Sequence, residues 1–337
     1  MSKWRSFKKV ELHRHMEGSV RLQTVLDVAS EAGVVLPSRN IEVLRKYACV
    51  TSPMENLAVV LDKFWLVQSV LATPGIIERV AYENCIDAFN DGIRVLELRY
   101  SPSFMSVNHP ELTYDSIHQA VLAGVSRAQK ELKDKIAVGL ICIITRDQPF
   151  TEAEKTADFA IENKDTFVGF DLAGDEAISS SVFAPLFKKV AHSGIKITVH
   201  SGEANVLNAP QLLRQTIEEL QPARIGHGVQ VINDLKIIEF VKQSGVVLEL
   251  CPTSNLLTKA VGNILEHPLK KLLDMGVKVT LNSDDPHLFC IDLTHEYETM
   301  ATHHGMGVEE FNLLNSIALK ASFISPEKIK KAWDAAP

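Results

Sequence analysis

The sequence predicts an α/β fold, a (β/α)8 barrel with additional helices after its first strand. The chain has 337 residues, which is enough for one large domain. Short apolar runs rich in β-branched residues alternate with longer amphipathic segments, the pattern of parallel strands joined by helices. The interiors of these runs lack strict polar alternation, so we expect both faces of the sheet to be covered.

Eight runs are expected to form the strands: Val10–His15, Val95–Tyr100, Ile136–Thr145, Val168–Leu172, Lys196–His200, Arg224–His227, Val246–Leu250 and Lys278–Asn282. Eight strands with intervening helices in a chain of this length favour a (β/α)8 barrel, and an open doubly wound sheet is the alternative. No repeat or linker interrupts the alternation, so residues 1–337 are expected to form a single domain.

About eighty residues separate the first two strands, far more than one crossover helix needs. Helices are predicted there at Arg21–Ala32, Pro53–Leu71 and Pro74–Asn90. We expect these extra helices, about residues 21–92, to cover the C-terminal face of the barrel. Phe64 and Trp65 would then form a wall or lid, and their packing in an ordinary core is the alternative.

The remaining helices follow the later strands. They are predicted after Ser101-Pro102, at Glu152–Asn163, Ala184–Ser193, Ala209–Leu220, Asp234–Ser244 and His267–Met275, and over the tail from Val308 to Trp333. Pro102, Pro252 and Pro286 each stand just past a strand, where the missing amide donor costs the sheet nothing.

The composition limits which classes of partner and which cellular compartment we expect for this protein. A net charge of −7 without a Lys/Arg run argues against nucleic acid and anionic membranes as partners. The five cysteines are scattered and form no Cys-x-x-Cys pair, so neither a disulfide framework nor a thiolate zinc site is indicated. The longest apolar stretch, Ile136 to Ile144, is too short to span a bilayer. We expect a reduced, cytoplasmic protein, a monomer or weak homo-oligomer.

The first strand runs into a pair of histidines. Side chains alternate along an extended strand, so His13 and His15 point to the same side. Two imidazoles on one side can reach a single metal ion, and imidazole nitrogen suits Zn²⁺. Taken alone, the pair can also be a coincidence on a half-exposed strand.

Other polar groups stand at matching places, because the active site of such a barrel lies at the carboxyl ends of the strands. These ends carry Asp171–Glu176, His200–Ala204, Gly226–Gly228, Cys251–Asn255 and Ser283–Pro286. Each has a structural alternative: a His-Gly turn, a helix N-terminus at the paired aspartates, or a solvated loop. Their joint placement at one end of one fold favours a site.

Three neutral imidazoles and a carboxylate hold Zn²⁺ with one position left for water, whose pKa the metal lowers towards neutrality. His13, His15 and His200 are the candidate imidazole ligands, and Asp284 or Asp285 is the carboxylate. The other aspartate is free to orient a substrate nitrogen. Glu203 is suited to move protons if burial stabilises its acid form. A two-metal site is disfavoured because the fourth strand ends without a bridging lysine.

The rim motifs as a set resemble the adenosine deaminase family over roughly residues 9 to 325. The matching motifs are Val10–Gly18, Leu96–Pro102, Asp171–Glu176, His200–Ala204, Arg224–Val229, Cys251–Asn255 and Leu281–Pro286, in the family's order. The resemblance implies a (β/α)8 barrel with one catalytic zinc. It also implies hydrolytic deamination of adenosine and 2′-deoxyadenosine to the inosine nucleosides and ammonia, a reaction of purine salvage.

The resemblance also implies roles for the rim residues. The zinc ligands would be His13, His15, His200 and Asp284. Glu203 would protonate purine N1, and His227 would orient the attacking hydroxide.

Substrate contacts follow from the same resemblance. Asp285 would bond N7, the amide of Gly174 would meet N3, and Glu17 would face the ribose 5′-hydroxyl. His15 would also border the substrate, and Phe64 and Trp65 would cover the pocket.

One residue departs from the family pattern. Nucleoside-specific members commonly carry Asp where this chain has Glu17, whereas adenine and aminofutalosine deaminases often carry Glu. The segments Leu61–Phe64 and Leu281–Tyr297 favour adenosine. No basic cluster marks the rim for a phosphate, which disfavours a nucleotide.

Two other classes of function compete with the deaminase. One is a non-catalytic purine-binding barrel, which is disfavoured because a competent residue fills every ligand and proton-transfer position. The other is a mononuclear hydrolase of cyclic amides, which would not explain Glu203 beside Asp285.

Overall fold

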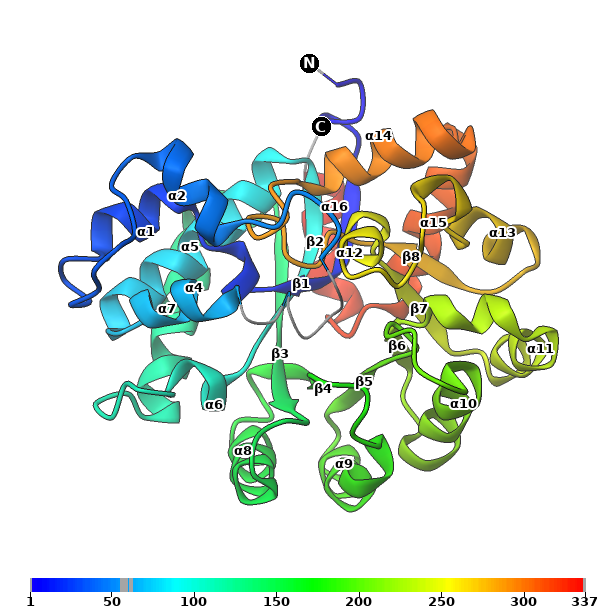
Figure 1. The fold of residues 1–337 in the computed structure, drawn as a ribbon, viewed down its shortest axis with the longest axis horizontal. Coiled ribbons are helices and arrows are strands. Elements are labelled where there is room, and N and C mark those ends of the chain that lie inside the picture. Colours follow the sequence, from blue (N-terminus) through cyan, green and yellow to red (C-terminus); the bar gives the residue numbers. More distant parts are fainter. Residues whose placement is uncertain (1, 55–59, 61–62, 336–337) are drawn as a thin grey trace.

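A computed structural model describes residues 2–54, 60 and 63–335. Its centre is a single sheet of parallel strands in the order β1 to β8, surrounded by helices (Figure 1). The strands are β1 (Lys9–His15), β2 (Ile93–Tyr100), β3 (Ala137–Thr145), β4 (Phe167–Ala173), β5 (Lys196–Ser201), β6 (Arg224–His227), β7 (Val247–Leu250) and β8 (Val279–Leu281). All eight predicted strands are confirmed, with ends that differ by at most two residues.

The sheet closes where β8 meets β1. The Asp284 amide donates to the His13 carbonyl at 2.9 Å, and the His15 amide donates to the Asp284 carbonyl at 3.0 Å. The Glu11 carboxylate also accepts from the Ser283 amide at 3.1 Å. These contacts make the sheet a (β/α)8 barrel rather than an open doubly wound sheet, and they place His13, His15 and Asp284 at one seam.

The described helices are α1 (Leu22–Val28), α2 (Ile41–Ala48), α4 (Phe64–Val70), α5 (Pro74–Asn90), α6 (Pro102–Met105), α7 (Tyr114–Glu131), α8 (Phe150–Glu162), α9 (Ala184–His192), α10 (Ala209–Leu220), α11 (Leu235–Ser244), α12 (Pro252–Leu257), α13 (Leu269–Asp274), α14 (Leu293–His304), α15 (Val308–Ala321) and α16 (Pro326–Ala335). None of them combines the length and apolar character needed to cross a bilayer.

Several helix predictions need correction. Within the expected helix Pro53–Leu71, Val60 and α4 (Phe64–Val70) are helical, Pro53 and Met54 are not, and residues 55–59 and 61–62 lie outside the described part. The tail forms two helices because Pro326 begins a new one. The sequence prediction missed α2, although the helix is amphipathic and the Asn40 side chain caps it by accepting from the Glu42 and Val43 amides.

The barrel interior carries charge as well as apolar side chains. A column of five fully buried ionic side chains, Glu97, Arg224, Glu249, Arg99 and Asp171, crosses it. Arg224 pairs with Glu97 and Glu249, and Arg99 pairs with Glu249 and Asp171, both at 2.8 Å. Because buried charges persist only when they are paired, this charged column is a continuous ionic network that leads up to the rim histidines.

Candidate active site

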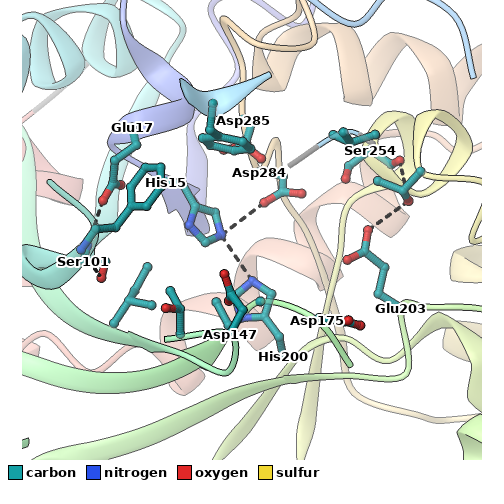
Figure 2. Close-up of a pocket in the computed structure, with 18 of the residues that line it drawn as sticks. His15, Glu17, Ser101, Asp147, Asp175, His200, Glu203, Ser254, Asp284 and Asp285 are labelled. Atoms are coloured by element: carbon teal, nitrogen blue, oxygen red, sulfur yellow. Dashed lines mark hydrogen bonds and ion pairs between the residues drawn. The ribbon is translucent and has the colours of Figure 1, made fainter. Parts of the chain in front are cut away.

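A cavity of about 340 Å³ opens at the C-terminal ends of the strands. Figure 2 shows His15, His200, Glu203, Asp284 and Asp285 around it, with Glu17 and Ser101 on the other side of His15. The site residues predicted from the sequence therefore lie together, although they come from strand ends far apart in the chain.

Imidazoles from two strands meet the Asp284 carboxylate at the cavity floor. The Oδ1 atom of Asp284 lies 3.2 Å from His13 Nε2 and 3.4 Å from His15 Nε2. The Nε2 atoms of His15 and His200 are 3.2 Å apart, as the dashed line in Figure 2 marks. Burial, the largest effect, lowers the pKa of both His15 and His200, so these imidazoles stay neutral and can act as ligands.

The surroundings of His13 indicate that this group of imidazole and carboxylate atoms can hold a cation. The Nε2 atom of His13 is buried and has no hydrogen-bond partner within the described residues. Burial and Arg99 act to lower the pKa of His13, but the adjacent carboxylates of Asp284 and Glu249 outweigh them and raise it to about 9. A positive charge at this Nε2, from a proton or a metal, is therefore favoured.

The Nδ1 atoms of two imidazoles are fixed from below by the charged column. Glu249 Oε2 lies 2.7 Å from His13 Nδ1, and the Asp171 carboxylate lies 3.1 Å from His200 Nδ1. Each carboxylate accepts a hydrogen bond from the Nδ1–H group, so the lone pair that can bind a metal is on Nε2. Arg99 holds both carboxylates in place. Glu249 and Arg99 were not among the site residues predicted from the sequence. A charged residue inside each otherwise apolar strand was the feature that could have indicated them.

His227 is close enough to count as a further ligand. Donor atoms of His13, His200, His227 and Asp284 all lie within 4.8 Å of one another, a group that contains His227 instead of His15. However, the Asn255 side-chain amide donates to His227 Nδ1 at 3.1 Å, while its oxygen faces His267 Nε2 at 3.2 Å. The proton of neutral His227 is then on Nε2, which makes it a donor towards the cavity rather than a metal ligand.

Local backbone geometry aims these groups. His227 and Asp284 both have positive φ values, 60° and 63°, which are uncommon for residues with a Cβ and cluster at functional sites. Gly18 is required beside them, because a Cβ there would stand 1.7 Å from Asp285 Oδ1. Gly174, with φ of 91°, lines the cavity and leaves its backbone accessible.

Glu203 lies at the side of the cavity near His227. Its Oε1 accepts from the Thr258 hydroxyl at 2.9 Å, and its Oε2 is 3.4 Å from His227 Nε2. Its backbone is fixed by Glu176, whose Oε2 accepts from the amides of Gly202, Glu203 and Ala204 at 3.0–3.1 Å. Burial, followed by the charge of Asp284, raises the pKa of Glu203 to about 8, so the carboxyl can carry a proton at neutral pH.

Two further carboxyl groups point into the cavity with unsatisfied oxygens. Asp285 Oδ1 and Glu17 Oε2 are buried and have no partner among the described residues. Burial, followed by the charge of Asp284, raises the pKa of Asp285 well above its usual range, and burial raises the pKa of Glu17 to about 7. Glu17 Oε1 accepts from the Ser101 amide at 2.8 Å. Both groups are placed to bond polar atoms of a ligand.

Aromatic side chains form one wall. Phe64 and Trp65 of α4 line the cavity and contact Phe104 of α6, with ring centroids 6.5 and 5.2 Å apart. Trp65 is 45% exposed, so it is not an ordinary core residue. A (β/α)8 barrel with a group of imidazole and carboxylate donors at its rim, beside proton-carrying carboxyls, is typical of a metal-dependent hydrolase.

Comparison with known proteins makes this class more specific. A family model described as adenosine deaminase matches residues 8–335, so the chain belongs to the adenosine deaminase family. It is similar to the adenosine deaminase of Shewanella loihica, with 36% identity and 98% of both chains covered. The adenosine deaminase of Klebsiella pneumoniae is 34% identical, with 96% of both chains covered.

Solved structures agree on the fold. The N6-methyl-AMP deaminase of Arabidopsis thaliana superposes with a TM-score of 0.83 at 26% identity, covering 98% of this chain and 96% of the other. The adenine deaminase of Arthrobacter aurescens reaches a TM-score of 0.87 at 23% identity, covering 97% and 98%. At that identity the latter likeness concerns the fold alone.

Proposed function

We propose that this protein is a zinc-dependent adenosine deaminase, which hydrolyses adenosine and 2′-deoxyadenosine to inosine and 2′-deoxyinosine with release of ammonia. The observation that carries the proposal is the arrangement of Glu203, His227 and Asp285 around one cavity, directly beside the imidazole and carboxylate donors. The names of the curated relatives support the same reaction.

His13, His15, His200 and Asp284 would hold the zinc ion. The orphaned Nε2 of His13 and the anchored Nδ1 atoms of His13 and His200 fit this role. Because the Asn255 amide donates to His227 Nδ1, the proton of His227 is on Nε2, which cannot then bind the metal. This favours His15 as the third imidazole ligand. Bound zinc supplies a hydroxide nucleophile at neutral pH.

Glu203 would hold the proton that activates the purine ring. Its acid form donates to N1, which draws electron density from C6 and makes this carbon a better electrophile. The Nε2–H of His227 would orient the attacking oxygen by donating a hydrogen bond to it. The neutral acid of Asp285 would donate to N7, which as a ring nitrogen lone pair can only accept.

The overall reaction consumes one water. The oxygen of this water becomes O6 of the product, and the amino group leaves C6 as ammonia after it takes up a proton through Glu203.

Charge and space in the cavity favour a nucleoside over a nucleotide. The lining includes Asp147, Asp175 and Glu176 as well as Glu17, and Figure 2 labels Asp147 and Asp175 among the lining residues. This acidic lining would repel a 5′-phosphate. The volume of about 340 Å³ is within the range of small-molecule pockets and exceeds what a bare adenine requires. Glu17, hydrogen-bonded to the Ser101 amide, would meet the ribose 5′-hydroxyl with its free oxygen.

An ultraviolet assay that offers adenosine, 2′-deoxyadenosine, adenine and AMP side by side tests the proposal. We expect kcat/KM for the two nucleosides to exceed that for adenine and AMP by about 10²-fold or more, since lost or repelled polar contacts carry penalties of this order. A preference for adenine would instead favour the second candidate, an adenine or aminofutalosine deaminase, for which the longer side chain of Glu17 is the supporting feature.

We also propose that the enzyme acts in the cytoplasm as a monomer or weak homo-oligomer and has no nucleic-acid partner. All five cysteines are free, which is typical of a reducing compartment. Light scattering on the purified protein would test the oligomeric state.

A further inference from the structure

A pair of cysteines, Cys49 and Cys290, lies outside the residues that line the active-site cavity. Cys49 directly follows α2, and Cys290 follows the cavity residue Phe289. Their sulfur atoms face the same acceptor, the carbonyl oxygen of His287, at 3.4 and 3.8 Å. Residues distant in the sequence thus bring two sulfurs to one carbonyl oxygen.

The surrounding chain holds the two cysteines in place. The Val50 amide, next to Cys49, donates to the Leu288 carbonyl at 2.8 Å, and Val50 and Leu288 pack in one small apolar cluster with Phe289. The φ value of Cys290 is 56°, in the left-handed region that a residue with a Cβ rarely adopts. The two backbones are therefore already joined beside the thiols.

The two sulfurs have different environments. Cys290 is exposed, whereas Cys49 and the other three cysteines are buried. Arg45 Nη1 lies 3.2 Å from Cys290 Sγ. The neighbouring Cys49 and the contact with Arg45 lower the pKa of Cys290 to about 6, while the pKa of Cys49 is raised. An accessible thiol beside a cation, with a second thiol on the same carbonyl oxygen, is the arrangement of a thiol that reacts with peroxide and is then resolved.

We propose that Cys49 and Cys290 form an oxidation site, at which a hydroperoxide converts the two thiols into an intramolecular disulfide. The Cys290 thiolate attacks one peroxide oxygen; the S–O bond forms, the O–O bond breaks, and hydroxide leaves. Cys49 then attacks the sulfur of the Cys290 sulfenic acid; the S–S bond forms, and the S–O bond breaks. The leaving hydroxide takes the Cys49 proton, so two thiols and one hydrogen peroxide give a disulfide and two waters.

The disulfide would link the chain that leads towards Val60 and Phe64 with the loop that carries Phe289, all of which line the cavity. Because it closes a very long loop, it should raise Tm by about 5 °C. Neither sulfur lines the cavity, so kcat/KM should stay within about twofold in the Cys49→Ser and Cys290→Ser variants.

The test treats the zinc-loaded enzyme with stoichiometric hydrogen peroxide, with and without dimedone, and maps peptides by mass spectrometry. We expect the wild type to lose two hydrogens, to yield a Cys49–Cys290 linked peptide without a dimedone adduct, and to recover with dithiothreitol. Cys49→Ser should trap dimedone at Cys290, whereas Cys290→Ser should show no modification at Cys49. Arg45→Gln should slow the reaction about tenfold, and Arg45→Lys should slow it less.

Three results would overturn the proposal: a wild type that keeps both thiols, a disulfide that joins two chains through Cys290, or equal rates in the wild type and Arg45→Gln. Deaminase activity serves as a separate readout, because loss of the oxidation reaction leaves the assay of the four purines unaffected.

Discussion

The floor and the aromatic wall of the cavity are built in different ways. On the floor, His13 is fully buried, comes from a strand end, and is held by Glu249 from the charged column. On the wall, Trp65 comes from the short helix α4, is 45% exposed, and makes its ring contact with Phe104. The floor is thus a rigid network of hydrogen bonds, and the wall is a set of apolar contacts.

This difference teaches how the tasks are divided. Ligand and proton-transfer groups must be held within a fraction of an ångström, which paired charges below the strand ends achieve. A wall that only encloses the substrate needs shape and apolar surface. Changes on the floor should therefore abolish metal binding or turnover, and changes on the wall should alter KM.

The largest effect is expected at the floor itself. His13→Ala should lose most of the bound zinc and lower kcat/KM by about 10⁴-fold or more, since the hydroxide and its position disappear together. Metal analysis and the deaminase assay measure both, with the exposed His303→Ala as the control. Full zinc content in the variant would show that His13 is not a ligand.

The next effect separates chemistry from metal binding. Glu203→Gln should keep its zinc and lower kcat by about 10²–10⁴-fold, because the amide cannot transfer a proton to N1. Parallel metal analysis and steady-state kinetics provide the test, and Glu218→Gln on the surface of α10 is the matched control. Turnover at the wild-type rate would remove Glu203 from the mechanism.

A substitution in the charged column should have a smaller effect, and this effect should be on zinc affinity. Glu249→Gln weakens the acceptor for His13 Nδ1 and should reduce zinc affinity by about 10–100-fold, the usual effect of such a supporting group. Competition with a chelator measures the affinity, and a melting curve shows that the variant is folded. Unchanged affinity in a folded variant would mean that the column supports the barrel but not the metal site.

The smallest effect is expected at the wall. Trp65→Ala should raise KM by about fivefold with kcat within twofold, because one partly exposed aromatic contact is worth roughly 1 kcal/mol. The KM of Trp65→Phe, which keeps an aromatic ring, should lie between the KM of the wild type and that of Trp65→Ala. A drop in kcat as large as that of Glu203→Gln would contradict the division between floor and wall.

The sequence predicted the strands and the rim residues because both are local signals. Apolar runs such as Lys196–His200 mark a buried strand, and the polar group that follows marks its carboxyl end. The ionic pairs of Arg99 with Glu249 and Asp171 could not be predicted, since each joins strands distant in the sequence. The proton position on His227 depends on Asn255, which again requires the folded geometry.

The helices show the same limit. The predicted helix Pro74–Asn90 has its exact bounds in the structure because Thr73 caps it and Pro74 starts it. In contrast, α14 was missed: its hydrophobic face is weak, and it is fixed by Glu296, which accepts from the Thr253 amide at 2.9 Å. Tertiary contacts, rather than its own sequence pattern, hold such an element.

The most direct test of the account is anomalous diffraction at the zinc absorption edge from crystals of the isolated protein. We expect one peak, bonded to the Nε2 atoms of His13, His15 and His200 and to the Asp284 carboxylate, with His227 outside bonding distance. A peak bonded to His227 in place of His15, or an active deaminase without a peak, would contradict the assignment of the floor.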